Sequence, residues 1–143
     1  MSSGSRSSTG APVVVDTSIV LKWFYPAEDG AGPAIELLRQ HERDEVTLVA
    51  PADLPIEVIN VLTYLGADSD DAERAIRLLT DVGLLMAPVD EGLLVDAARI
   101  ASTEKLALYD AAFIALAARL DAELATADLR QAATTSCRVH LIA

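Results

Sequence analysis

Short apolar runs alternate along the chain with longer segments in which apolar residues recur every three or four positions. Short β-branched runs bounded by Pro, Asp or Gly predict buried strands, and the longer periodic segments predict amphipathic helices. The expected strands cover residues 13–16, 47–50, 85–89, 123–126 and 138–142. The expected helices cover residues 18–24, 31–42, 53–65, the segment from 69 onward, 90–100, 110–120 and 129–133.

Strands therefore alternate with helices from one end of this pattern to the other. Such an order predicts an α/β fold with a parallel sheet that helices cover on both faces. In sheets of this kind, ligands bind at the carboxyl ends of the strands, near the point where the strand order reverses. Asp16 and Asp128 each follow an expected strand, so both are candidates for a site at that edge.

The length of 143 residues favours one domain. The opening MSSGSRSSTG is rich in Ser and Gly, so we expect residues 1–11 to be a disordered lead-in and residues 12–143 to form the domain. No apolar run approaches the ~20 residues that a membrane span needs, and no membrane association is expected. The single cysteine, Cys137, excludes an internal disulfide and favours a reducing cytoplasm.

The net charge of −11, from 11 basic and 22 acidic residues, argues against a protein that binds nucleic acid through a broad basic face. Two interpretations remain. Either the substrate is not a nucleic acid, or metal ions and a few local cations make the contacts with phosphate.

Four carboxylates lie in otherwise apolar surroundings: Asp16, Glu57, Asp110 and Asp128. Burying a carboxylate is unfavourable unless it is paired or binds a metal, and this chain has few cations to pair with. Carboxylate oxygens are ligands that Mg²⁺ and Mn²⁺ prefer, and such ions activate water and stabilise charge on a phosphoryl group. A divalent-metal site that assists hydrolysis is therefore the leading hypothesis.

A simpler interpretation exists for three of these acids. Asp is a preferred N-cap, so Asp16, Asp110 and Asp128 could each only begin a helix. Glu57 differs, because we expect it inside a helix among apolar neighbours. Asn60 follows one turn later on the same face and could share a ligand with Glu57. The alternative for this pair is a solvent-exposed stripe.

Hydroxyl and basic residues accompany the acids. Ser18 and Thr126 lie beside Asp16 and Asp128 in the sequence, and we expect their hydroxyls to orient the carboxylates, although capping would also explain them. Lys22, Lys105 and Arg130 each lie near one of the acids in the sequence and are candidates for contact with phosphate. The alternative for all three is a solvated surface charge.

Four segments, in order along the chain, resemble a PIN domain of the compact kind found in VapC-type toxins: VVVDTSIVLKWF, PIEVINVL, LYDAAFIALA and LATADLR. The resemblance implies a three-layer α/β/α sandwich with a parallel sheet of four or five strands. It also implies a four-acid centre that binds Mg²⁺ or Mn²⁺ and cleaves RNA to 5′-phosphate and 3′-hydroxyl ends. The family's acids fall on Asp16, Glu57, Asp110 and Asp128, and its serine and threonine on Ser18 and Thr126.

The resemblance thus predicts a metal-dependent endoribonuclease, the toxin of a toxin–antitoxin pair, with a homodimer and an inhibitory antitoxin as its assemblies. Two alternatives stay open. A receiver-type regulatory module would need an acid pair after the first strand and a Lys after the last, whereas this chain has Asp16-Thr17-Ser18 and no such Lys. The second alternative is a PIN domain that serves RNA maturation, or one that is an inactive binding partner. The presence of all four acids argues against an inactive protein.

Overall fold

The computed structural model describes residues 10–142 and contains a five-stranded sheet in the order β3-β2-β1-β4-β5, with every neighbouring pair parallel. The strands are β1 (Ala11–Val15), β2 (Val46–Pro51), β3 (Leu85–Ala87), β4 (Glu123–Thr126) and β5 (Arg138–Leu141). The helices are α2 (Thr17–Phe24), α3 (Ala31–Glu42), α4 (Leu54–Tyr64), α5 (Ser69–Val82), α6 (Glu91–Glu104), α7 (Leu108–Arg119) and α8 (Leu129–Ala132).

Strand β1 lies at the centre of the sheet because its side chains are apolar on both faces. Its Val14 pairs with Val49 of β2 on one side and with Leu124 of β4 on the other. All three of these side chains are buried. A run of β-branched residues with no polar alternation is what a strand covered on both faces requires.

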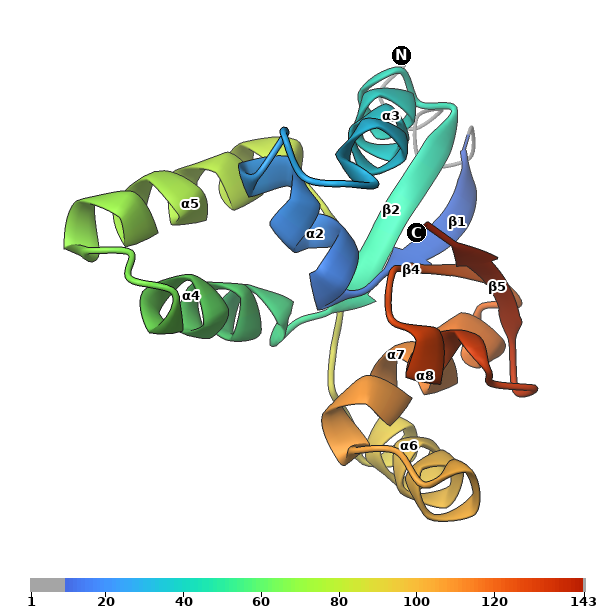
Figure 1. Cartoon of the computed structure of the whole chain (residues 1–143). Helices are drawn as coiled ribbons and strands as arrows, with labels where there is room; N and C mark the ends of the chain where they lie inside the picture. Colours follow the sequence, from blue (N-terminus) through green and yellow to red (C-terminus); the bar gives the residue numbers. More distant parts are fainter. Residues whose placement is uncertain (1–9, 143) are drawn as a thin grey trace.

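Helices form a layer on each side of this sheet (Figure 1). Helices α2 and α3 pack together over β4 and β2, whereas α7 contacts β1, β2 and β4, and α6 packs on α7. Helices α4 and α5 form a pair that extends from the edge of the sheet beside α2 (Figure 1). The predicted three-layer α/β/α sandwich with a parallel sheet is confirmed.

Small side chains allow α7 to lie close to the sheet. Every residue from 111 to 117 is buried, and most of them are alanines. An Ala-rich surface lets a helix backbone approach its neighbours closely, and Ala also has the highest helix propensity. This close approach places the first turn of α7 over the carboxyl edge of the sheet.

Several boundaries differ from the expected ones by one to four residues, and two of these differences bear on the first strand and on Asp110. Helix α7 begins at Leu108, with Ala107 as its N-cap, so Asp110 is not a cap but a residue of the first turn. Strand β1 begins at Ala11, which pairs with Val46, two residues before the expected start of this strand at Val13. The rest of the expected lead-in, residues 1–9, lies outside the described residues.

No helix within residues 10–142 has the length and apolar character to cross a membrane.

Candidate active site

The strand order reverses between β1 and β4, since β1 connects onward to β2 while β4 lies on its other side. A crevice forms at the carboxyl ends of the strands at such a point. Asp16 immediately follows β1, and its backbone N–H donates to the carbonyl of Ala125 in β4 at 3.3 Å. Asp128 follows the end of β4.

All four predicted carboxylates line one small cavity at this point. The cavity measures about 160 Å³, and Asp16, Glu57, Asp110 and Asp128 come to it from four different parts of the fold. Each lies at the start of a helix. Asp16 is the N-cap of α2 and Asp128 of α8, whereas Glu57 and Asp110 lie in the first turns of α4 and α7.

Helix N-termini present backbone N–H groups and positive partial charge, which stabilises nearby carboxylates. The capping interpretation is therefore correct for two of the acids. Asp16 accepts a hydrogen bond from the backbone N–H of Ile19 at 3.1 Å, and Asp128 accepts one from that of Arg130 at 2.8 Å. At these two positions the same carboxylate caps a helix and lines the cavity.

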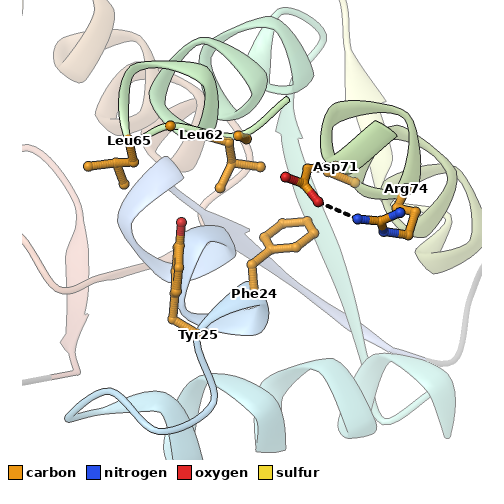
Figure 2. A pocket seen from close by; sticks show the side chains of 9 residues that line it. Phe24, Tyr25, Leu62, Leu65, Asp71 and Arg74 are labelled. Carbon is orange, nitrogen blue, oxygen red and sulfur yellow. Dashed lines mark hydrogen bonds and ion pairs between the residues drawn. The ribbon is translucent and has the colours of Figure 1, made fainter. Parts of the chain in front are cut away.

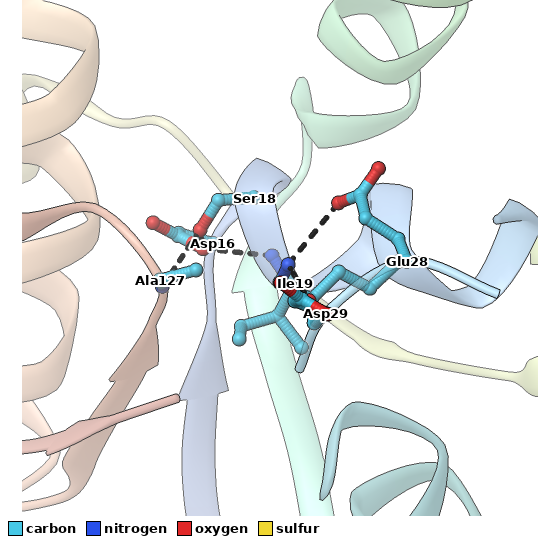
Figure 3. Close-up of polar contacts among 7 residues, drawn as sticks. Asp16, Ser18, Ile19, Glu28, Asp29 and Ala127 are labelled. Atoms are coloured by element: carbon cyan, nitrogen blue, oxygen red, sulfur yellow. Dashed lines mark hydrogen bonds and ion pairs between the residues drawn. The ribbon is translucent and has the colours of Figure 1, made fainter. Parts of the chain in front are cut away.

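Asp16 is held at both carboxylate oxygens, and only 3% of its surface is exposed. Ser18 Oγ donates to Asp16 Oδ1 at 2.6 Å, and Thr126 Oγ1 donates to Asp16 Oδ2 at 2.5 Å. Ser18 Oγ also accepts from the backbone N–H of Ala127 at 2.9 Å, so it joins α2 to the end of β4 (Figure 3). The structure thus places both predicted hydroxyls on the Asp16 carboxylate.

Two of the acids have raised pKa values. Burial raises the pKa of Asp16, and the negative charge of Asp128 adds to this, while hydrogen bonds from Ser18, Thr126 and the Ile19 N–H act in the opposite direction. Burial also raises the pKa of Asp110, again with a contribution from Asp128, which the positive charge of Arg130 partly offsets. Burial and the neighbouring carboxylate therefore both make ionisation of Asp16 and Asp110 less favourable than in water.

These donors fit a divalent cation by their chemistry. Carboxylate oxygens are the preferred ligands of Mg²⁺ and Mn²⁺. None of the four acids forms an ion pair with a Lys, Arg or His of residues 10–142. Over the same residues, however, no three His, Cys, Asp or Glu side chains stand ready as a ligand set for one ion. Within the described residues the four acids thus share a cavity without being gathered into a ready ligand set.

The remaining predicted residues are placed differently. Asn60 is exposed and does not line the cavity, so it does not lie in the same site as Glu57. Lys22 is buried, and its ammonium donates to Glu28 Oε1 at 3.1 Å and to the carbonyl of Asp29 at 2.6 Å. It does not line the acidic cavity, so the contact of Lys22 with phosphate stays a prediction.

Lys105 and Arg130 lie together near the first turn of α7. The Arg130 guanidinium donates to the backbone carbonyl of Lys105 at 3.5 Å, and both side chains are exposed. Because Arg130 also lowers the pKa of Asp110, this residue places positive charge beside the acidic cavity, whereas Lys105 contributes a backbone contact to Arg130.

Among the polar residues that line the cavity, Tyr109 and Gln131 were not identified from the sequence. Tyr109 precedes Asp110, and its hydroxyl lies 3.2 Å from Thr17 Oγ1. Gln131 lies one turn after Asp128 and is buried. A polar residue three positions after an acid on a short helix was the available signal for Gln131.

Comparison with known proteins agrees with this geometry. The model of the family described as "PIN domain" matches residues 13–135, a span that includes all four acids. The chain belongs to the PIN domain family. PIN domains are nucleases as a class and generally use divalent metal ions. The match excludes the receiver-type alternative, whose strand order of 2-1-3-4-5 also differs from the order found here.

Three solved structures show the extent of the likeness to other PIN-like folds. PAE2754 from Pyrobaculum aerophilum is 21% identical, with a TM-score of 0.62 and 91% of each chain covered. A toxin–antitoxin complex from Klebsiella pneumoniae is 18% identical, with a TM-score of 0.67, 92% of this chain and 98% of that chain. FitAB bound to an IR36 DNA fragment is 19% identical, with a TM-score of 0.65, 90% of this chain and 94% of that chain. No curated protein matches the chain.

A larger groove lies away from the acids. It measures about 490 Å³ and is lined mainly by apolar side chains of α2, α4 and α5, among them Phe24, Tyr25, Leu62 and Leu65 (Figure 2). An ion pair between Asp71 and Arg74 borders it (Figure 2). Because an apolar groove without metal ligands does not suit hydrolysis, this surface is a candidate for binding another protein.

Proposed function

We propose that this PIN domain is a metal-dependent endoribonuclease and the toxin of a toxin–antitoxin pair. The observation that carries the proposal is the convergence of Asp16, Glu57, Asp110 and Asp128 on one cavity at the switch point of the sheet. The matched family supports nuclease chemistry, and one similar structure is a toxin–antitoxin complex from Klebsiella pneumoniae.

In this proposal Asp16 and Asp110 are the principal ligands of Mg²⁺ or Mn²⁺, and Glu57 and Asp128 complete the site. A bound ion would supply a Lewis acid for the scissile phosphate and lower the pKa of an attacking water. The protein's own part is to hold these acids in place. Ser18 and Thr126 fix both oxygens of Asp16, and the exposed Lys105 and Arg130 offer positive charge for the RNA backbone beside the cavity.

The activity is tested with the purified full-length chain and single-stranded RNA. We expect cleavage in Mg²⁺ or Mn²⁺, none in excess EDTA, and recovery when Mn²⁺ is restored, because all the predicted ligands are carboxylates. Product ends are identified by ligation and end-labelling, with 5′-phosphate and 3′-hydroxyl expected. Cleavage that persists at full rate after chelation would contradict a metal-dependent mechanism.

The toxin role is tested in cells. We expect induced expression to arrest growth, and co-expression of the neighbouring reading frame to restore it. Normal growth on expression of a protein that cleaves RNA in vitro would favour the RNA-maturation alternative. We also propose that the protein acts in the cytoplasm, since its single cysteine suits a reducing compartment, and that it forms a homodimer, as the family resemblance implies.

The groove between α2, α4 and α5 is where we propose that an apolar segment of the antitoxin binds. Its rim exposes large apolar side chains that nothing in the described chain covers, Leu65 at 61% and Tyr25 at 39%. A protein partner would remove this surface from water, which is the main source of stability at such interfaces.

We expect Leu65→Glu to weaken binding of the antitoxin by about tenfold or more, because it places a charge in an apolar contact. Leu85→Glu is the matched control, since Leu85 is 58% exposed on β3, outside the groove. Both affinities are measured by surface plasmon resonance with the product of the neighbouring reading frame. Equal affinities for the two variants would place the antitoxin elsewhere.

A further inference from the structure

Gln131 is a buried polar side chain in a helix that otherwise faces solvent. Helix α8 has four residues, and within this fully described helix Gln131 is the single buried one, at 1% exposure. Its neighbour Leu129 is 71% exposed. A carboxamide in the interior is unfavourable unless both of its ends are hydrogen-bonded. Apolar packing therefore does not explain why a Gln is buried at position 131.

Both ends of the Gln131 carboxamide are bonded, and they reach different elements. Its Nε2 donates to the backbone carbonyl of Asp110 at 2.9 Å, and its Oε1 lies 3.0 Å from Thr126 Oγ1. The orientation of the amide follows from its partners, because the Asp110 carbonyl only accepts and must therefore face the nitrogen. The side chain thus joins the first turn of α7 to the end of β4.

Thr126 extends this connection to two further acids. Its hydroxyl lies 2.5 Å from Asp16 Oδ2 and accepts from the backbone N–H of Asp128 at 2.9 Å. The hydroxyl has a single proton, which both Asp16 Oδ2 and Gln131 Oε1 attract. One carboxamide and one hydroxyl therefore relate the positions of Asp16, Asp110 and Asp128.

We propose that Gln131 is a positioning residue that sets the separation of the metal ligands Asp16 and Asp110. The inference rests on the proposed function, in which these two acids are the principal ligands. Asp16 is held by Thr126 at the end of β4, whereas Asp110 lies on α7, so the bridge through Gln131 joins the two elements that carry these acids. Residues that hold ligands without touching the metal commonly contribute 10- to 100-fold in metal affinity or activity.

The test is Gln131→Met, which keeps the length of the side chain and removes both hydrogen bonds. We expect the affinity for Mn²⁺, measured by isothermal titration calorimetry on the full chain, to fall by about 10- to 100-fold. RNA cleavage should need correspondingly more Mn²⁺, and kcat should recover largely at saturating Mn²⁺ while KM for RNA stays near the wild-type value. Gln131→Asn, which keeps the amide but shortens its reach, should also bind Mn²⁺ more weakly than the wild type.

Trp23→Phe is the matched control for the loss of a buried hydrogen bond. Trp23 is buried, and its Nε1 donates to the carbonyl of Ala34 at 2.9 Å, between α2 and α3. This variant should lower Tm and leave the affinity for Mn²⁺ unchanged. A merely structural role for Gln131 would make its variants behave like this control.

The outcomes separate the two proposals. If Gln131→Met folds and binds Mn²⁺ with wild-type affinity, the positioning role is overturned. If Gln131→Met does not fold, wild-type affinity for Mn²⁺ in Gln131→Asn overturns the positioning role instead. A wild-type protein that neither binds Mn²⁺ nor cleaves RNA instead contradicts the proposed function itself. Weaker binding in the Gln131 variants, with the Trp23 variant unchanged, supports the assignment.

Discussion

Asp16→Asn is expected to abolish metal-dependent RNA cleavage, lowering kcat/KM by about a thousandfold or more. The substitution replaces a carboxylate ligand by a neutral amide, and the contribution of such an ion to transition-state stabilisation is several kcal/mol, with each 1.4 kcal/mol worth about tenfold in rate. The measurement is cleavage of a labelled RNA in saturating Mn²⁺. Unchanged cleavage would remove Asp16 from the site and with it the proposed mechanism.

The fold should survive this change, because Asn is as good an N-cap as Asp. Its Oδ1 still accepts from Ser18 Oγ and the Ile19 N–H, as Asp16 does. Its amide nitrogen donates to Thr126 Oγ1, which then gives its own proton to Gln131 Oε1. Loss of activity in a protein that folds normally is therefore the expected combination.

The thermal stability of Asp16→Asn without metal is the control that separates a loss of activity from a loss of folding. The direction in which this stability changes with pH follows from the pKa of Asp16. Burial raises the pKa of Asp16, so the native state holds a proton more tightly than the unfolded state does, and ionisation above that pKa destabilises the native state. In EDTA at pH 7, Asp16→Asn should therefore have a Tm equal to or above the wild-type value. The difference in Tm between Asp16→Asn and the wild type should shrink as the pH falls through the raised pKa of Asp16 toward the ordinary Asp value near 4. Calorimetric melts across this range measure it.

Phe113→Ala is expected to reduce the free energy of unfolding by about 3–5 kcal/mol, the usual loss for truncating a fully buried Phe. Phe113 is 1% exposed on α7 and lines the acidic cavity, and its ring packs edge-on against Tyr109 with centroids 5.2 Å apart. Domains have only about 5–15 kcal/mol in total, so this is a large fraction. Urea denaturation followed by circular dichroism measures the change.

Phe24→Ala is the matched control, because Phe24 is half-buried on α2 at the surface groove. Its truncation leaves a gap open to solvent rather than a closed cavity, and we expect a loss of about 1–2 kcal/mol. Equal losses for the two phenylalanines would show that α7 is not the centre of the core.

The alternation of strands and helices was predictable because the strand signals are local. The run Val13-Val14-Val15 has no polar residue to orient outward, so its burial on both faces follows from its composition. The start of α7 was not predictable in this way. Helix α6 ends at Glu104, and its C-cap Lys105 has a φ of 60°. Ala107 then caps α7, which packs along α6, so the capping preference of Asp110 does not set the start of this helix.

The chemistry of Lys22 shows a second limit of sequence reasoning. Its position shortly after Asp16 suggested a cation for the site. Distance along a helix does not decide which surface a long side chain reaches, and the ammonium instead bonds Glu28 and the Asp29 carbonyl. Asn60 illustrates the same point, since one turn from Glu57 it faces solvent.

The sequence alone determined the parallel α/β architecture and identified the four acids as candidates for a site. Both follow from residues that are neighbours in the chain: the spacing of apolar residues predicts the strands and helices, and apolar neighbours mark the unusual carboxylates. Only the tertiary structure decided that Asp16, Glu57, Asp110 and Asp128 meet in one cavity, since they come from four elements that the sheet order and the packing of α4 and α7 bring together. It also decided that Gln131 joins two of those elements. Hydrogen bonds between residues distant in the chain depend on distances that only the folded backbone sets.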